Sequence, residues 1–268
     1  MANDENQAIN KLIDVMAKLR DPNGGCPWDL KQNFSTIVPY TLEEAYEVAH
    51  AIEQQDWPEV KNELGDLLFQ VVFYAQLGKE QQLFDFEEIA DAVSEKLIRR
   101  HPHVFGELTV AGEAEIKQNW ENIKAKERAA KSESGKASAL DDVPVALPAL
   151  SRAAKLQKRA AHQGFDWPDV SGVIDKLAEE QNELTEALSS GDMEHVAEEL
   201  GDLMFTAVNL ARHLKKDPEQ LLRLANDKFE RRFRSVEGQL VNESMSLSDY
   251  SLDELEKAWQ SAKTEQST

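Results

Sequence analysis

Apolar side chains recur every three or four residues along almost the whole chain, which is the spacing of an amphipathic helix. The stripe nearest the N-terminus comprises Ile9, Leu12, Ile13, Met16 and Leu19. A later stripe comprises Leu200, Leu203, Met204, Ala207, Val208 and Ala211. Alternating apolar and polar runs, which are typical of strands, are scarce. The pattern therefore predicts an all-α protein.

The same spacing, together with turn signals, predicts about ten helices. They are expected near residues 5–20, 42–54, 58–78, 86–100, 113–130, 149–162, 170–189, 192–215, 218–240 and 250–264. Asp217 followed by Pro218 offers an N-cap and a first-turn proline for one of them. Tight turns are expected around Trp57 and Gly191.

The chain carries two copies of one helical unit. Glu-Glu-x-x-Glu at 43–47 recurs at 179–183, and Glu-Leu-Gly-Asp at 63–66 recurs at 199–202, each shifted by 136 residues. A tandem duplication explains a constant shift. A stretch rich in Ser, Lys, Gly and Pro separates the copies. We therefore expect three segments: a domain at 1–127, a linker at 128–148 and a domain at 149–268.

Composition narrows the class of protein. Hydrophobic residues make up 41% of the 268 residues and charged residues 30%, which suits a folded chain with a core. The net charge of −20 repels phosphate backbones, so nucleic acid is not an expected partner. The single cysteine, Cys26, excludes an internal disulfide. With no signal-peptide pattern and no apolar run long enough for a membrane, we expect a cytoplasmic protein.

The repeated acidic residues are the strongest chemical signal. A helical hairpin that turns at Gly191 places Glu183 level with Glu199. It also places Glu180 level with Asp202. The equivalent acids of the first copy are Glu44, Glu47, Glu63 and Asp66. Clustered carboxylates repel one another and need a cation, and oxygen-only ligands favour Mg²⁺, with Mn²⁺ possible.

Other interpretations of these acids remain open. In a chain with 50 acidic residues, Glu-x-x-Glu often marks only a solvated helix face. Thr41 to Glu44 could form a capping box, in which Glu44 would cap a helix instead of binding metal. Gly65 and Gly201 lie in mid-helix, where glycine costs about 1 kcal/mol, so we expect a ligand or another helix to approach closely there. The duplicated hairpin favours the metal hypothesis.

A basic cluster on one later helix consists of Lys228, Arg231 and Arg232. These side chains could bind phosphates through charge-assisted hydrogen bonds, or equally pair with surface acids such as Glu230. Trp259 and its counterpart Trp120 could stack on a base, although a tryptophan in an amphipathic helix more often packs in a core.

These motifs together resemble the two-domain bacterial form of the MazG nucleoside triphosphate pyrophosphohydrolases. The resemblance spans nearly the whole chain and includes residues 20–29, 40–44, 99–105, 164–167 and 228–233. It implies an all-α fold in which helices from two subunits complete each bundle, and hence a homodimer. It implies Mg²⁺-dependent hydrolysis of NTPs or dNTPs to the monophosphate and pyrophosphate, in the housecleaning of nucleotide pools.

The resemblance also implies roles for individual residues. The metal ligands would be Glu180, Glu183, Glu199 and Asp202. The residues around the nucleotide would be Lys176, Glu179, Lys228, Arg231, Arg232 and Trp259. Glu179 is the preferred acceptor of the proton from the attacking water, so the catalytic set is Glu179, Glu180 and Glu183.

The second copy is the expected hydrolase. The first copy would be a second active site, a regulatory nucleotide site or a dimerisation unit. Two further hypotheses compete: a non-catalytic tandem helical module that senses nucleotides or scaffolds other proteins, and a helical hydrolase restricted to one substrate such as dUTP.

Overall fold

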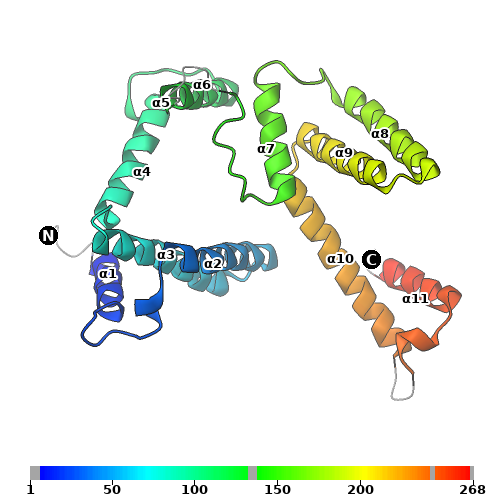
Figure 1. Cartoon of the computed structure of the whole chain (residues 1–268), viewed down its shortest axis with the longest axis horizontal. Coiled ribbons are helices and arrows are strands. Elements are labelled where there is room, and N and C mark those ends of the chain that lie inside the picture. The colour runs from blue at the N-terminus through cyan, green and yellow to red at the C-terminus, as the bar shows by residue number, and fades with distance from the viewer. Residues whose placement is uncertain (1–6, 132–137, 242–244, 266–268) are drawn as a thin grey trace. The chain divides into compact units, whose positions relative to one another are not determined.

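The computed structural model of this chain describes residues 7–131, 138–241 and 245–265 (Figure 1). All the regular elements within these ranges are helices, which confirms the all-α prediction. The chain forms two compact units, Met1–Ile123 and Lys124–Thr268, which we describe separately. The domain boundaries expected from the sequence stay a prediction, and residues 132–137 of the expected linker lie outside the described residues.

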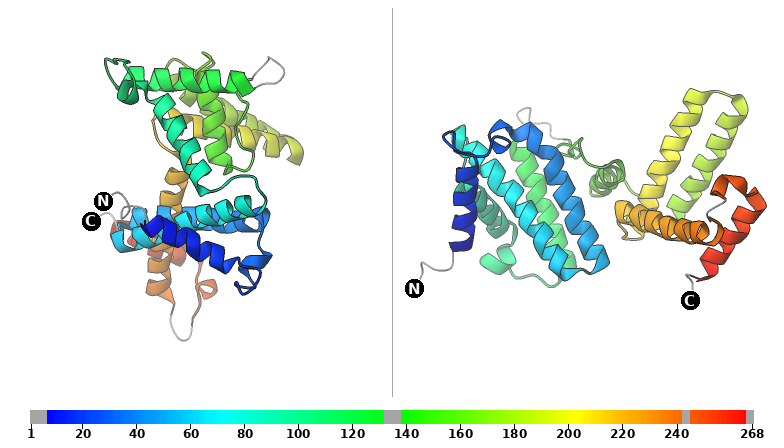
Figure 2. Two further views of the ribbon diagram at one scale, coloured as in Figure 1. Left: turned by 90° about the vertical axis from the view of Figure 1, so that its left-hand side faces the viewer. Right: turned by 90° about the horizontal axis from the view of Figure 1, so that it is seen from below.

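The first unit is built around a helical hairpin. Its elements are α1 (Gln7–Leu19), the short 3-10 turn η1 (Asp29–Lys31), α2 (Phe34–Gln54), α3 (Trp57–Glu80), α4 (Phe86–Arg100) and α5 (Pro102–Phe105). Helix α6 (Glu113–Lys131) begins in this unit and ends beyond its boundary at Ile123. Helices α2 and α3 lie side by side in both views of Figure 2. The buried core that joins α1 to this hairpin comprises Met16, Ile37, Val72, Phe73 and Leu77. Burial of this apolar surface holds the hairpin in place.

The second unit repeats the hairpin. Its elements are α7 (Ala149–Ala161), α8 (Val170–Ser190), α9 (Met193–His213), α10 (Pro218–Leu240), η2 (Leu247–Asp249) and α11 (Leu252–Glu265). Helices α8 and α9 form the hairpin, and α7 packs on α9. Helices α10 and α11 share a small core of Val236, Ala258 and Ala262. The repeated helical organisation agrees with the predicted tandem duplication. None of the described helices combines the length and hydropathy needed to cross a bilayer.

The turns of the two hairpins are built alike. Gly191 directly follows α8 and Gln55 directly follows α2, and both of these C-cap residues have left-handed backbone. Asp192 then caps α9 and Asp56 caps α3, because each side chain accepts a hydrogen bond from a backbone N–H of the first turn. These turns place the repeated acids of each hairpin on facing helices.

Helix α2 begins at Phe34, well before the predicted start at residue 42. The prediction was wrong because Pro39, which usually marks a helix boundary, lies inside the helix. The cap at Asn33 and the burial of Ile37 in the core outweigh the hydrogen bond that Pro39 cannot donate.

The longer α2 also corrects the capping-box interpretation. Thr41 lies in the interior of α2, and its hydroxyl donates to the carbonyl of Ile37 at 3.2 Å. The capping box of this helix is formed by Asn33 and Thr36 instead. Glu44 is therefore not a capping residue, and its carboxylate is available for other interactions.

Candidate functional site

The α8–α9 hairpin brings three acidic side chains together. Glu180, Glu199 and Asp202 each offer a carboxylate oxygen, and these oxygens lie within 4.8 Å of one another. Glu180 is only 4% exposed, Glu199 is half-buried and Asp202 is exposed. The three oxygen ligands thus range from a buried side chain to an exposed one.

Glu183, the fourth acid expected at this site, lies outside that trio but within its electrostatic field. Desolvation raises the pKa of the Glu183 carboxyl above its ordinary value. The ammonium of Lys176 opposes this rise in the pKa, and the carboxylate of Glu199 adds to it. The raised pKa thus reflects burial first, and the neighbouring carboxylates second.

The nearest cation to the trio is Lys176. Its Nζ lies 2.6 Å from Oε1 of Glu179 and 3.0 Å from Oε1 of Glu180. These hydrogen bonds raise the pKa of Lys176, so its side chain is a protonated ammonium at neutral pH. On the facing helix, Nε2 of His195 lies 2.9 Å from Oε1 of Glu199. The second-unit cluster therefore carries its own partial counter-charge.

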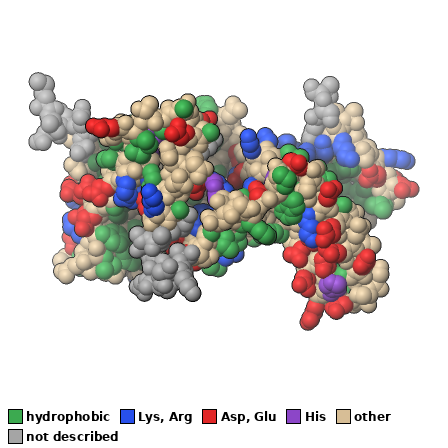
Figure 3. Space-filling model, turned by 90° about the horizontal axis from the view of Figure 1, so that it is seen from above, with side chains coloured by type: hydrophobic (Ala, Val, Ile, Leu, Met, Phe, Trp, Pro, Cys, Tyr) green, Lys and Arg blue, Asp and Glu red, His purple; other side chains and the backbone are tan. Residues whose placement is uncertain are grey.

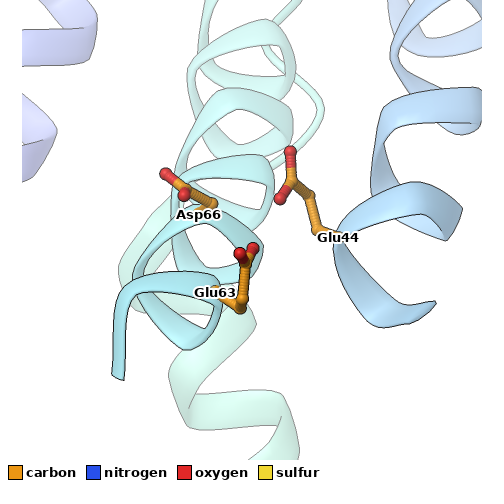
Figure 4. Close-up of side chains that lie close together, drawn as sticks. All are labelled: Glu44, Glu63 and Asp66. Atoms are coloured by element: carbon orange, nitrogen blue, oxygen red, sulfur yellow. The ribbon is translucent and has the colours of Figure 1, made fainter. Parts of the chain in front are cut away.

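The first unit holds an equivalent cluster. Glu44 extends from α2 toward Glu63 and Asp66 on α3 (Figure 4), and their oxygens also lie within 4.8 Å of one another. Desolvation raises the pKa of Glu44, and the charge of Asp66 raises it further. Glu47, the fourth acid expected in this unit, is exposed and is not part of the trio. The acids of the two hairpins are thus arranged in the same way.

The surroundings of the two clusters differ. A shift of 136 residues places Tyr40 at the position of Lys176, and Glu59 at the position of His195. The first-unit cluster therefore lacks both basic neighbours. Its buried neighbour is Gln70, which donates from Nε2 to Oε1 of Glu44 at 3.4 Å.

Neither His195 nor Gln70 was singled out by the sequence analysis. Both occupy positions where the two copies differ, since His195 replaces Glu59 and Gln70 stands where the second copy has Thr206. The differences between the two copies at positions near the shared acids could therefore have identified both residues.

The donor set fits a hard divalent cation. Each trio consists of carboxylates alone, and such ligands suit Mg²⁺ or Mn²⁺. Zinc and copper sites normally include histidine or cysteine, which neither trio contains. Glu180 is buried, and within the chain its carboxylate is paired with the ammonium of Lys176.

The mid-helix glycines beside the clusters lie in open space. A Cβ placed at Gly65 or Gly201 would meet no atom within 4 Å outside its own helix backbone and chain neighbours. The expectation that another helix of this chain packs there is wrong for the described residues. The approach of a ligand or of a second chain stays a prediction.

The predicted nucleotide-binding residues of α10 and α11 do not contact the acids. Within residues 138–241 and 245–265, no hydrogen bond or ion pair joins the second-unit trio to Lys228, Arg231 or Arg232. Glu230, the surface acid considered as their alternative partner, contacts Arg234. A single chain therefore does not assemble the basic cluster around the acids.

Trp259 is half-buried and packs against the α10–α11 core. Its ring centroid lies 5.4 Å from that of Phe229. The structure thus shows the core-packing arrangement for this tryptophan, which stays partly exposed.

Comparison with known proteins links both hairpins to one family. The profile of the MazG nucleotide pyrophosphohydrolase domain matches residues 32–105 and again residues 170–236. A nucleoside triphosphate pyrophosphohydrolase of Escherichia coli K12 is 48% identical over 260 residues, which cover 96% of this chain and 98% of the relative. The nucleoside triphosphate pyrophosphohydrolase/pyrophosphatase MazG of Thermotoga maritima is 41% identical over 255 residues, 95% of each chain. Both acid trios lie inside the matched segments.

Proposed function

The chain belongs to the MazG nucleotide pyrophosphohydrolase family, and from that premise we propose that its second unit hydrolyses NTPs or dNTPs to the monophosphate and pyrophosphate with Mg²⁺. The observation that carries this proposal is the convergence of Glu180, Glu199 and Asp202 within 4.8 Å on one hairpin. The names of the Escherichia coli and Thermotoga maritima relatives support the hydrolysis of nucleoside triphosphates.

Different acids of the second hairpin have different proposed roles, in metal binding and in proton transfer. Glu180, Glu199 and Asp202, with Glu183 beside them, would hold the cation. A bound divalent ion neutralises phosphate charge and lowers the pKa of a coordinated water. Glu179 is exposed beside this cluster and is our candidate for accepting the proton of the attacking water.

Lys176 is placed to exchange partners. Its ammonium ion-pairs with Glu179 and Glu180, and it is 30% exposed. Once a divalent cation neutralises the trio, this ammonium can bind a phosphate oxygen of the substrate instead. Tyr40 cannot do the same in the first unit, because a phenol carries no positive charge at neutral pH. We therefore assign hydrolysis to the second unit and retain a regulatory or structural role for the first.

We further propose that the protein works as a homodimer in the cytoplasm. Both hairpins expose the same apolar stripe, formed by Leu64 and Leu68 on α3 and by Leu200 and Met204 on α9. Figure 3 shows hydrophobic side chains at the surface among the acidic ones. Packing of these stripes against a second copy would complete each bundle, as expected for exposed apolar patches that recur in a duplicated fold.

We assign the basic cluster on α10 a role in nucleotide binding within the dimer. Lys228 and Arg231 are exposed, and Arg232 is half-buried with no partner for its Nε. We propose that dimerisation brings these cations, with Trp259, to the bound nucleotide. Arginine side chains would then contact the phosphates through paired N–H donors.

The test is a panel of NTPs and dNTPs assayed for pyrophosphate release with Mg²⁺ and with EDTA. We expect release from one or more nucleotides in Mg²⁺ and none in EDTA. Nucleotide binding without pyrophosphate release from any member of the panel would favour the non-catalytic sensing or scaffold module. Release from dUTP alone would favour the single-substrate hydrolase.

A further inference from the structure

A pocket of about 280 Å³ lies in the second unit between α7, α9 and the Gly164-Phe165-Asp166-Trp167 segment. Its walls are mainly apolar, and three aromatic rings line it, those of Phe165, Trp167 and Phe205. Phe165 is 83% exposed, which is unusually high for a phenylalanine. The volume is at the small end for ligand sites and suits one planar ring system better than a whole nucleotide.

One polar side chain in this pocket has an unused hydrogen-bonding atom. Gln157 is 8% exposed and lines the pocket. Its Nε2 donates to the carbonyl oxygen of Phe205 at 2.8 Å, which fixes the orientation of the amide. Its Oε1 is buried and has no hydrogen-bond partner. A buried acceptor without a donor calls for a ligand that supplies an N–H or O–H group.

The charged residues in the pocket wall already neutralise one another. Asp166 accepts a hydrogen bond from Nη1 of Arg212 at 2.9 Å, and Nε2 of His213 lies 2.9 Å from the same carboxyl group. The pocket therefore presents apolar rings and one fixed acceptor, without a free charge in its wall to hold a phosphate.

The pocket lies on the metal-cluster side of α9. Asn209 lines it and follows Asp202 by two helical turns, so both side chains leave the same face of the helix. Phe205 lies about one turn after Asp202, and the pocket thus begins about 5 Å along the α9 axis from Asp202. A ribose bridges a similar gap between a base and its first phosphate.

The first unit lines the corresponding region with different side chains. Phe73 stands at the position of Asn209 and is 1% exposed in the core. Ala-Lys-Leu-Arg at 17–20 matches Ala-Lys-Leu-Gln at 154–157, so Arg20 takes the place of Gln157. The Arg20 guanidinium lies 5.5 Å from the centre of the Phe73 ring and ion-pairs with Glu80. A pocket of about 890 Å³ adjoins this ion pair, so the first unit keeps the acids but lines the neighbouring space with charged side chains where the second unit has mainly apolar ones.

We propose that this pocket receives the base of the substrate nucleotide, with Oε1 of Gln157 accepting a hydrogen bond from a base N–H. The inference rests on the proposed function, because it takes the phosphates to lie at the neighbouring acids. The rings of Phe165 and Trp167 supply apolar contact with the base. Each common base carries an N–H on its Watson–Crick edge. One fixed acceptor can therefore bind any of the common bases and does not discriminate among them. The base then has a place that does not require Trp259, whose ring packs on Phe229.

The first test measures binding without hydrolysis. The full chain in EDTA is titrated calorimetrically with the four common nucleoside 5′-monophosphates and with ribose 5-phosphate. We expect one or more of the monophosphates to bind about tenfold more tightly than ribose 5-phosphate. Gln157→Leu and Phe165→Ala should abolish that difference. Phe105→Ala, which removes another exposed ring in the first unit, should preserve it.

The second test compares pyrophosphate release from NTPs with that from ribose 5-triphosphate, which has no base. Gln157→Leu should lower kcat/KM about tenfold for the NTP and leave kcat/KM for ribose 5-triphosphate unchanged. Because Phe165 is exposed, Phe165→Ala provides a variant whose melting temperature should equal that of the wild type. Equal losses on both substrates, or no loss in either variant, would overturn the proposal.

The two proposals fail differently. If no nucleotide is hydrolysed, the proposed function fails, and the calorimetric comparison still decides whether the pocket binds a base. If Glu180→Gln stops hydrolysis of both substrates while the two pocket variants leave base binding unchanged, the metal site stands and the base pocket is refuted.

Discussion

Gln55 and Gly191 occupy the same place in the two hairpins, and both have a positive φ, 57° and 76°. Each residue follows the last residue of the first hairpin helix and precedes the aspartate that caps the second. Glycine adopts this left-handed conformation without steric cost, whereas a side chain there costs about 1 kcal/mol. The first hairpin therefore carries strain that the second avoids.

Exchanging these turn residues should move stability in opposite directions. Gln55→Gly should raise the free energy of unfolding by about 1 kcal/mol, and Gly191→Gln should lower it by a similar amount. A Cβ at Gly191 would meet no atom within 4 Å, so the loss would come from the backbone alone. Urea denaturation followed by circular dichroism measures both changes.

Gln54→Gly provides the matched control for the turn. Gln54 is the last helical residue of α2, so glycine there should destabilise the protein. A Gln55→Gly variant that loses as much stability as Gln54→Gly would show that the left-handed turn is not strained.

The Arg20–Glu80 pair should make the stability of the first unit depend on acid pH. Arg20 donates from Nε to Glu80 at 2.8 Å, and these hydrogen bonds hold the pKa of Glu80 below its ordinary value despite partial burial. A lowered folded-state pKa stabilises the fold above the unfolded pKa of about 4.3. That contribution is lost as the pH falls through the folded-state pKa.

Glu80→Gln should therefore destabilise the protein by about 1–3 kcal/mol at pH 7, since it leaves the buried Arg20 guanidinium without its carboxylate. The difference from wild type should shrink at pH 3, where the wild type begins to lose the same interaction. Unfolding free energies at both pH values test this, with the exposed Glu87→Gln as control. A difference that is equal at pH 7 and pH 3 would contradict the assignment.

The exposed stripe on α9 should control the oligomeric state. Leu200 is 46% exposed, and Leu200→Lys would place a charge in the proposed dimer contact. We expect this variant to sediment as a monomer at concentrations where the wild type is a dimer. Leu252→Lys, at a site that is 80% exposed on α11, should leave the dimer intact. A wild type that stays monomeric at high micromolar concentration would refute the homodimer.

Helix spacing predicted most of the fold because long amphipathic stripes and strong caps leave few alternatives. The expected helix at 218–240 has those same bounds in the structure, since Asp217 caps it and Pro218 begins it. The start of α2 was missed because a proline inside a helix is rare. The short elements at 29–31, 102–105 and 247–249 were not predicted, because so few residues show no periodicity.

The sequence predicted the positions of the metal-binding acids better than the contacts that neighbouring helices make around them. The hairpin symmetry follows from regular helices and a short turn, and Glu180, Glu199 and Asp202 do converge. Glu183 lies only about 60° around α8 from Glu180, yet it is not among the three acids whose oxygens converge, and the helical spacing did not predict that difference. The contact between Gln157 and Phe205 depends on how α7 packs across α9, and no spacing within one helix encodes that.

The most direct test of the central claim compares Glu180→Gln with its structural equivalent, Glu44→Gln. Pyrophosphate release from an NTP is measured in Mg²⁺, with the exposed Glu186→Gln on α8 as control. We expect Glu180→Gln to lower kcat about 100-fold or more, and the other two variants to keep nearly the wild-type rate. Wild-type release by Glu180→Gln would contradict the proposal that the α8–α9 acids form the hydrolytic metal site.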